Sequence, residues 1–270
     1  MSTLSPSTSS SFTSTEVVDT PIANLDYDGS VAQITEWARN HESRYIGVCN
    51  VHSVISSRWT PKLREALTHS DFNTADGMPI VWMQKLLGYK DASRVYGPTL
   101  MLHTLAAAER QGLKVAFYGG HEDRLPILLE KLKEKFPELK IVEAISPPFR
   151  AITAEEDEEY TRRLVESEAQ ILWVGIGCPK QEDWMRQHRG RIPAVMLGVG
   201  AAFDFHAGAV AQAPSYLQKI GMEWAYRLYR EPKRLFKRYL TTNPIFIYKA
   251  TLQLIRHYCS FSAKRQNTAH

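Results

Sequence analysis

Leu172-Trp-Val-Gly-Ile-Gly-Cys-Pro-Lys180 contains the transition that decides the fold: a short run of large apolar residues that ends in closely spaced glycines. The same transition recurs in Val115-Ala-Phe-Tyr-Gly-Gly-His121 and in Met196-Leu-Gly-Val-Gly-Ala-Ala-Phe-Asp204. Such apolar runs are typical of parallel strands buried on both faces. Glycine at the carboxyl end of a strand lets the backbone approach a phosphate, and the following helix offers amide donors. The three junctions indicate a nucleotide site, although turn geometry alone explains such glycines equally well.

Short apolar runs alternate with longer amphipathic ones from about residue 28 onward, which predicts an α/β fold. Strands are expected at 45–49, 114–118, 171–174 and 194–197, with a weaker one at 140–144, and helices at 78–87, 100–111, 124–136, 154–167 and 179–188. We therefore expect a mainly parallel, Rossmann-like sheet with helices on both faces. The glycine loops lack the full dinucleotide fingerprint and the Walker A sequence, which disfavours a nicotinamide dehydrogenase or a P-loop NTPase.

The composition indicates a soluble globular protein of one or two domains, with 270 residues, 44% hydrophobic and 23% charged. Its three cysteines are scattered without metal-ligand or disulfide spacing, which favours a reducing, cytoplasmic compartment. Residues 1–25 are expected to be a disordered Ser/Thr-rich leader, because they contain too few apolar residues to offset the entropy of ordering. Residues 26–215 would form the α/β body and residues 216–270 a C-terminal appendage.

The appendage carries the positive charge of the chain. Residues 216–270 contain 11 Lys and Arg but only two acidic residues, whereas residues 1–215 have a net charge of −5. At helical spacing, Trp224, Leu228, Leu235 and Tyr239 form an apolar stripe, and Pro232 marks a break or a new helix start. Asn243-Pro244 resembles a further capped helix start. Such a basic amphipathic segment favours an anionic partner, and on charge alone phosphate groups, anionic lipid headgroups and nucleic acid all qualify.

Three polar residues stand where a sheet-edge site would need them. Asp76 follows a short strand-like stretch and could accept a proton from a hydroxyl nucleophile, or merely cap the next helix. Arg94 precedes a helix and could pair with phosphate oxygens, or be an ordinary surface arginine. Gln181 lies in the first turn of a helix after a glycine loop, where it could bind a sugar, a base or a phosphate.

Metal chemistry is not expected. Asp204 with His206 is more typical of a hydrogen-bonded structural pair than of a metal site. Asp26-Tyr-Asp28 has the form of a DxD metal motif, but no strand precedes it. Cys49 and Cys178 are interpreted as inert thiols.

Seven segments together resemble one family. They are Asn50-Val-His-Ser-Val54, Ala75-Asp-Gly77, Arg94-Val-Tyr-Gly97, Phe117-Tyr-Gly-Gly120, Gly175-Ile-Gly-Cys-Pro-Lys-Gln-Glu182, Gly198-Val-Gly-Ala-Ala-Phe-Asp-Phe-His-Ala-Gly208 and Glu223-Trp-Ala-Tyr-Arg-Leu-Tyr-Arg-Glu-Pro-Lys-Arg234. In this order and spacing the chain resembles the WecG/TagA/CpsF family of bacterial glycosyltransferases. The resemblance spans residues 45 to about 240.

The resemblance implies transfer of a sugar from a UDP-sugar to a polyprenyl-diphosphate-linked sugar at the inner face of the cell membrane. It implies inversion at the transferred sugar, no bound metal and no cofactor. Asp76 matches the family's proposed general base. Substrate contacts are then expected at Asn50, Arg94, Gly119, Gly120, Gly175, Gly177, Gln181, Gly198, Asp204, Arg227, Arg234 and Lys237. The last three would belong to an appendage that closes over the site.

Departures from the family pattern leave the donor open. Val48 stands where the family usually has Thr, Gln212 where it has Arg, and Lys237 where it has Arg. N-acetylmannosamine is the first expectation, with glucose-type or uronic-acid donors as alternatives, and a non-catalytic UDP-sugar-binding regulatory protein as another. A nucleic-acid partner is not expected because the body is acidic, and a homo-oligomeric resting form could shelter the appendage.

Overall fold

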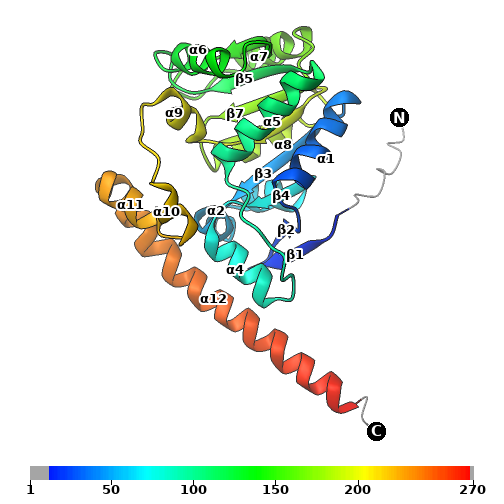
Figure 1. Cartoon of the computed structure of the whole chain (residues 1–270), viewed down its shortest axis with the longest axis vertical. Helices are drawn as coiled ribbons and strands as arrows, with labels where there is room; N and C mark the ends of the chain where they lie inside the picture. The colour runs from blue at the N-terminus through cyan, green and yellow to red at the C-terminus, as the bar shows by residue number, and fades with distance from the viewer. Residues whose placement is uncertain (1–11, 268–270) are drawn as a thin grey trace.

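One parallel sheet organises the computed structural model, which describes residues 12–267 apart from the side chains of Ser215, Lys219, Arg234 and residues 261–267 (Figure 1). Its order is β4-β3-β8-β7-β5-β6, and every neighbouring pair is parallel. The strands are β3 (Arg44–Cys49), β4 (Phe72–Ala75), β5 (Lys114–Gly119), β6 (Lys140–Ile145), β7 (Ile171–Gly175) and β8 (Val195–Gly198). The expected parallel α/β fold is confirmed. Because all strands run one way, their carboxyl ends meet at one sheet edge.

Apolar side chains fill both faces of the sheet, as the strand sequences predicted. Val115 and Phe117 of β5 pack into one core, and Ala116 and Tyr118 pack into the opposite one. The first face is covered by α1 (Tyr27–Arg39), α5 (Gly97–Gln111), α6 (Leu125–Lys135) and α9 (Ala202–Ala207). The second face is covered by α2 (Val51–Ser56), α3 (Pro61–Thr68), α4 (Met78–Leu86), α7 (Ala154–Glu166) and α8 (Lys180–His188).

The expectation of a disordered leader over residues 1–25 is wrong from residue 12 onward. β1 (Ser14–Val17) and β2 (Thr20–Ala23) form an antiparallel hairpin, joined by Val18 and Asp19 with φ of 48° and 64°. Two left-handed residues make the tight turn whose twist suits a hairpin. The hairpin is stable because its few apolar side chains are buried in the core of α2, α3 and α4. Residues 1–11, the rest of that expectation, lie outside the described residues.

The C-terminal segment consists of α10 (Ser215–Lys219), α11 (Glu223–Arg230) and α12 (Pro232–Asn267). α12 begins at Pro232, as expected, but runs through Pro244, so the helix start expected at Asn243 is wrong. The helix lies along one side of the body and its last turns project beyond it (Figure 1). Phe246 and Ala250 are buried against the body, and this packing supports the helix across the proline. Over residues 12–267, every helix is too short or too polar to cross a bilayer.

Side-chain hydrogen bonds fix α12 to elements from the start of the chain. Gln253 accepts a hydrogen bond from the backbone N of Val18 at 2.9 Å and donates one to the carbonyl of Glu16 at 2.7 Å. The Tyr258 hydroxyl donates to the carbonyl of Leu86 at 2.7 Å. The N-terminal hairpin, α4 and α12 therefore form one packed unit beside the carboxyl edge of β3 and β4.

Candidate active site

Asp76 lies at the carboxyl edge of the sheet, one residue beyond β4. Its backbone N donates to the carbonyl of Cys49 at 2.8 Å, which continues the pairing with β3. Its carboxylate does not cap α4, whose N-cap is Gly77. Instead Oδ1 accepts a hydrogen bond from the backbone N of Gly97 at 2.9 Å, in the first turn of α5. The carboxylate is thus held at a helix N-terminus, at the edge where the glycine junctions also end.

The electrostatic surroundings of Asp76 are mixed. Burial raises the pKa of its carboxyl group above the ordinary value, and the negative charge of Glu223 acts in the same direction. Arg94, the N–H of Gly97 and Arg227 oppose these effects by stabilising the charged form. The net result is a raised pKa, as a proton acceptor needs in order to be effective near neutral pH.

Arg94 connects Asp76 to the C-terminal appendage. Its Nε donates to the carbonyl of Asp76 at 2.5 Å, and its Nη2 donates to Glu223 Oε2 of α11 at 2.6 Å. The guanidinium also lies over the ring of Tyr96, 4.2 Å from its centroid. Tyr96 in turn donates its backbone N–H to the hydroxyl of Tyr27 at 3.0 Å. Arg94 is therefore fixed in position, and its remaining N–H groups are the ones that could bind phosphate oxygens.

A cavity of about 440 Å³ opens between Asp76, α2, α4, α11 and α12. It brings together four of the residues expected from the sequence: Asn50, Asp76, Arg94 and Arg227. Asn50 caps α2, with Oδ1 accepting from the backbone N of His52 at 3.0 Å, so its acceptor oxygen is already engaged. The Nε of Arg227 is buried and has no hydrogen-bond partner among the described residues. An anionic ligand in the cavity would supply one.

Among the remaining expected residues, those whose side chains the structure describes lie outside the lining of this cavity. Lys237 of α12 is exposed and does not line the cavity, and the side chain of Arg234 falls outside the described residues. Asp204 pairs with Arg124 at 2.8 Å between α9 and α6. His206 shares a hydrogen bond of 2.9 Å with the carbonyl of Pro98. These contacts give Asp204 and His206 structural partners.

The glycine junctions at β5 and β7 are explained by close packing. A Cβ on Gly119 would lie 2.5 Å from the carbonyl carbon of Gly175, and φ of Gly119 is +121°. A Cβ on Gly175 would lie 2.7 Å from the ring of Phe203, and one on Gly120 would lie 3.1 Å from it. Gly177, by contrast, has φ of +84° and open space around its Cβ position. Only Gly177 leaves room for a ligand to approach directly.

Gln181 and Glu182 form a buried polar pair at the start of α8. Gln181 Nε2 donates to Glu182 Oε1 at 2.9 Å, and both side chains are almost completely buried. Gln181 Oε1 and Glu182 Oε2 have no partner in the described part of the chain. A Cβ on Gly198 would lie 2.9 Å from Gln181 Nε2, so Gly198 is needed to seat the Gln181 side chain. Burial raises the pKa of Glu182.

Sequence reasoning missed several residues that line the cavity. Glu223 stood inside a quoted motif, but nothing local indicated that its carboxylate turns inward to Arg94. His52 was passed over as well; burial lowers its pKa to about 4, and Arg238 acts in the same direction. The apolar residues Trp82 and Trp224 complete the wall. Only the packing of α4, α11 and α12 brings these side chains to Asp76.

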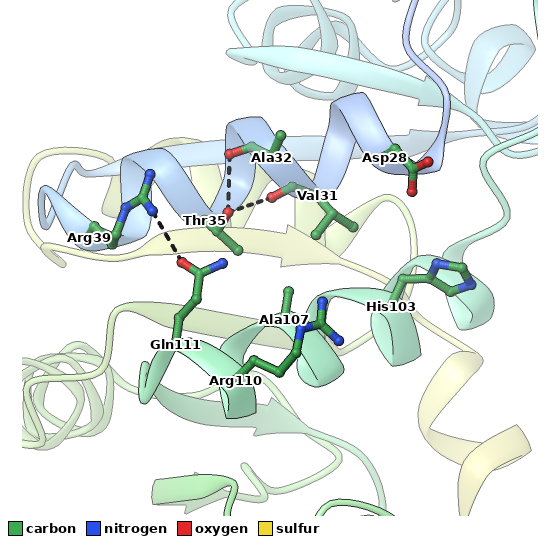
Figure 2. A pocket seen from close by; sticks show the side chains of 9 residues that line it. All are labelled: Asp28, Val31, Ala32, Thr35, Arg39, His103, Ala107, Arg110 and Gln111. Atoms are coloured by element: carbon green, nitrogen blue, oxygen red, sulfur yellow. Dashed lines mark hydrogen bonds between the residues drawn. The ribbon is translucent and has the colours of Figure 1, made fainter.

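A second groove, of about 360 Å³, lies between α1 and α5 (Figure 2). Asp28, Arg39 and Arg110 line it, away from the strand ends. Asp26 is the N-cap of α1 and accepts from the backbone N of Gly29 at 2.8 Å. The two carboxylates of the DxD-like sequence therefore belong to this helix and not to the cavity at Asp76.

Comparison with known proteins assigns this arrangement to a class of enzyme. The model of the glycosyl transferase WecG/TagA/CpsF family matches residues 15–260, and the chain belongs to that family. It is a glycosyltransferase. Among curated proteins, the chain is similar to an N-acetylglucosaminyldiphosphoundecaprenol N-acetyl-beta-D-mannosaminyltransferase of Bacillus spizizenii (strain ATCC 23059 / NRRL B-14472 / W23). The two are 28% identical over 223 residues, which cover 79% of this chain and 84% of the relative.

Proposed function

We propose that this enzyme transfers a sugar from a UDP-sugar to a polyprenyl-diphosphate-linked sugar in the synthesis of a cell-surface polysaccharide. The observation that carries the proposal is the Asp76 carboxylate, which stands with a raised pKa in a cavity that also contains Arg94 and Arg227. One carboxylate with cations beside it suits removal of a proton from an acceptor hydroxyl while a diphosphate leaves. The family membership and the acceptor in the relative's name agree with this chemistry.

The reaction would proceed in one displacement. Asp76 accepts the proton of the acceptor hydroxyl as its oxygen attacks the anomeric carbon, and the bond from that carbon to UDP breaks on the opposite face. The anomeric configuration is therefore inverted. Arg94 and Arg227 would balance the negative charge that develops on the departing diphosphate, so positive side chains supply what a metal supplies in other transferases.

N-acetylmannosamine is the first donor to test, because the relative's name specifies that sugar. Val48, which stands where the family usually has Thr, lies beside the reacting region: its Cγ1 would be 3.2 Å from a Cβ on Gly97, the residue that donates to Asp76. An apolar side chain there cannot form the hydrogen bond that a Thr hydroxyl could form, so the donor of the relative does not carry over directly. A glucose-type or uronic-acid donor is therefore the alternative, and a panel of UDP-sugars distinguishes them.

The deciding experiment measures UDP release from that panel with lipid-diphosphate acceptor analogues, in EDTA-containing buffer. Asp76→Asn is expected to reduce turnover by about 10³-fold or more while donor binding by calorimetry stays within a factor of a few. The neutral amide cannot take the proton, but it has the same size and can still accept from Gly97. Normal turnover by Asp76→Asn would remove this residue from the mechanism. Donor binding without turnover in the wild type would favour the regulatory alternative.

Membrane association at the inner face is part of the proposal. Exposed apolar residues of α11 and α12, including Tyr229, Phe236 and Leu240, alternate with exposed cations such as Lys233 and Lys237. Such a surface suits the boundary of an anionic bilayer. Cosedimentation with anionic vesicles should be strong at low salt and weak with neutral vesicles. Equal binding to both kinds of vesicle would contradict the electrostatic part of the proposal.

A further inference from the structure

The cavity at Asp76 has two chemically different ends. Asp76, Arg94 and Arg227 line the end next to the sheet. The other end runs between α4 and α12 and is walled by apolar side chains, which are Trp82, Met83, Leu86, Phe246, Ile247 and Leu254. We call this second part the α4–α12 groove. A ligand that filled the whole cavity would need a polar, anionic portion joined directly to a hydrocarbon portion.

The walls of the α4–α12 groove are apolar and yet open to solvent. Trp82 and Leu86 on α4 are each 47% exposed, and Ile247 on α12 is 64% exposed. Large apolar side chains that line a continuous groove are typical of a binding surface. From Met78 to Leu86, and again from Phe246 to Leu254, the wall follows nine residues of helix, whose eight rises of about 1.5 Å give a length of roughly 12 Å. The groove is therefore long enough for a short stretch of hydrocarbon chain.

The cavity is charged at one end and apolar at the other, and this order indicates which ligand it binds. A lipid-linked acceptor has a sugar at one end, a diphosphate in the middle and an isoprenoid tail at the other end. With its sugar hydroxyl at Asp76, its diphosphate would lie near Arg238 of α12, and its tail would enter the apolar end. We infer that the α4–α12 groove binds the diphosphate-proximal isoprene units of the acceptor. This inference rests on the proposed function and adds where the lipid lies and which residues contact it.

The groove gives the enzyme a means of recognising the lipid apart from the sugar. Contacts with Trp82, Leu86 and Ile247 would remove hydrocarbon from water, so each isoprene unit held there strengthens acceptor binding. The lining of the cavity ends at Leu86 and Leu254, so the rest of a long tail must leave the protein there. The bound acceptor would thus remain anchored in the bilayer while its head reaches Asp76.

The test compares two water-soluble acceptors that share the same sugar and diphosphate and differ only in the group beyond it, either a methyl group or two isoprene units. Reactions contain no membrane or detergent, so recruitment to a bilayer plays no part. For the wild type, kcat/KM should be at least tenfold higher for the isoprenoid acceptor. Ile247→Asp should reduce that ratio at least tenfold, because it places a carboxylate on the wall of the groove.

Ile255→Asp is the matched control. Ile255 lies on the same helix, is 53% exposed and does not line the cavity, so its variant should keep the wild-type ratio within twofold. Leu86→Asp, on the opposite wall, is a second variant whose ratio should fall like that of Ile247→Asp.

Three outcomes would overturn the inference while leaving the proposed function in place. They are equal kcat/KM for both acceptors in the wild type, a wild-type ratio in both groove variants, and an equal fall in the Ile255→Asp control. Absence of UDP release by the wild type with either acceptor and every donor would instead overturn the proposed function itself.

Discussion

Glu223→Gln tests how the appendage is coupled to the catalytic carboxylate. Glu223 and Arg94 form an ion pair at 2.6 Å, and their side chains are only 11% and 15% exposed. Gln has the same size and can still accept a hydrogen bond, so the variant removes the charge alone. The Arg94 guanidinium stays charged, so a hydrogen bond to a charged group, worth about 1.5–3 kcal/mol, is kept and only the attraction between two opposite charges is lost. Removing one partner of a buried pair altogether costs about 3–5 kcal/mol, so the free energy of unfolding should fall by about 1–2 kcal/mol. Urea denaturation measures this difference.

The same variant should also alter the pH dependence of activity. The negative charge of Glu223 raises the pKa of Asp76, so its removal lowers that pKa. Asp76 acts as a base only when ionised, and a lower pKa keeps it ionised in more acidic solution. The acidic limb of the kcat/KM profile should therefore move to lower pH. If Glu223 served only to stabilise the fold, Glu223→Gln would lower the free energy of unfolding and leave the acidic limb of the kcat/KM profile in place.

Glu231→Gln is the matched control, because it removes one negative charge from the same appendage outside the cavity lining. Its pH profile should match that of the wild type. The reasoning is refuted if Glu223→Gln leaves both the free energy of unfolding and the acidic limb unchanged, or if Glu231→Gln moves the limb equally.

Two further predictions concern the glycine junctions and His52. Gly119→Ala should lower the free energy of unfolding by about 2–6 kcal/mol, because the new Cβ would clash with the backbone of Gly175 and φ is positive. Gly177→Ala should lower it by only about 1–2 kcal/mol, because φ is positive but the space around the Cβ is open. Similar urea midpoints for the two variants would contradict the packing argument. With a pKa of about 4, the ring of His52 should stay neutral from pH 6 to 8. The unfolded chain takes up this proton more readily than the folded one, so the free energy of unfolding should decrease as the pH falls from 6.5 towards 4. Arg238→Gln should raise that pKa in an NMR titration, and an unchanged titration would contradict the assigned cause.

Local patterns predicted the sheet well. The five expected strands are present, and each boundary lies within one residue of its prediction. Buried parallel strands are continuous apolar runs, so their signal is strong and needs no partner to be recognised. The N-terminal hairpin was missed because its burial depends on α2, α3 and α4 and on Gln253, a residue more than two hundred positions away. Its few apolar residues were too sparse to predict a strand without that surface.

The candidate site was predicted in part. Asp76 was identified because a polar residue directly after a strand-like stretch must lie at the carboxyl edge of the sheet, and Arg94 because it stands just before a helix, where a guanidinium could pair with phosphate oxygens. The glycine motifs predicted ligand contacts, yet at Gly119, Gly120 and Gly175 the structure shows close packing on a neighbouring glycine or on Phe203. A glycine in the sequence does not show whether a ligand or a neighbouring residue occupies the space, because either one excludes a side chain at that position.

The sequence by itself determined five of the parallel strands, the helices α4 to α8, the edge at which Asp76 stands and the excess of positive charge in the last 55 residues. These properties depend on neighbours in the chain, whose periodicity and charge can be read directly. Only the tertiary structure decided that Glu223 meets Arg94, 129 residues away, and that α4 and α12 enclose an apolar groove next to Asp76. Such contacts depend on the direction in which α11 and α12 cross the body, and that direction is set by packing between distant surfaces.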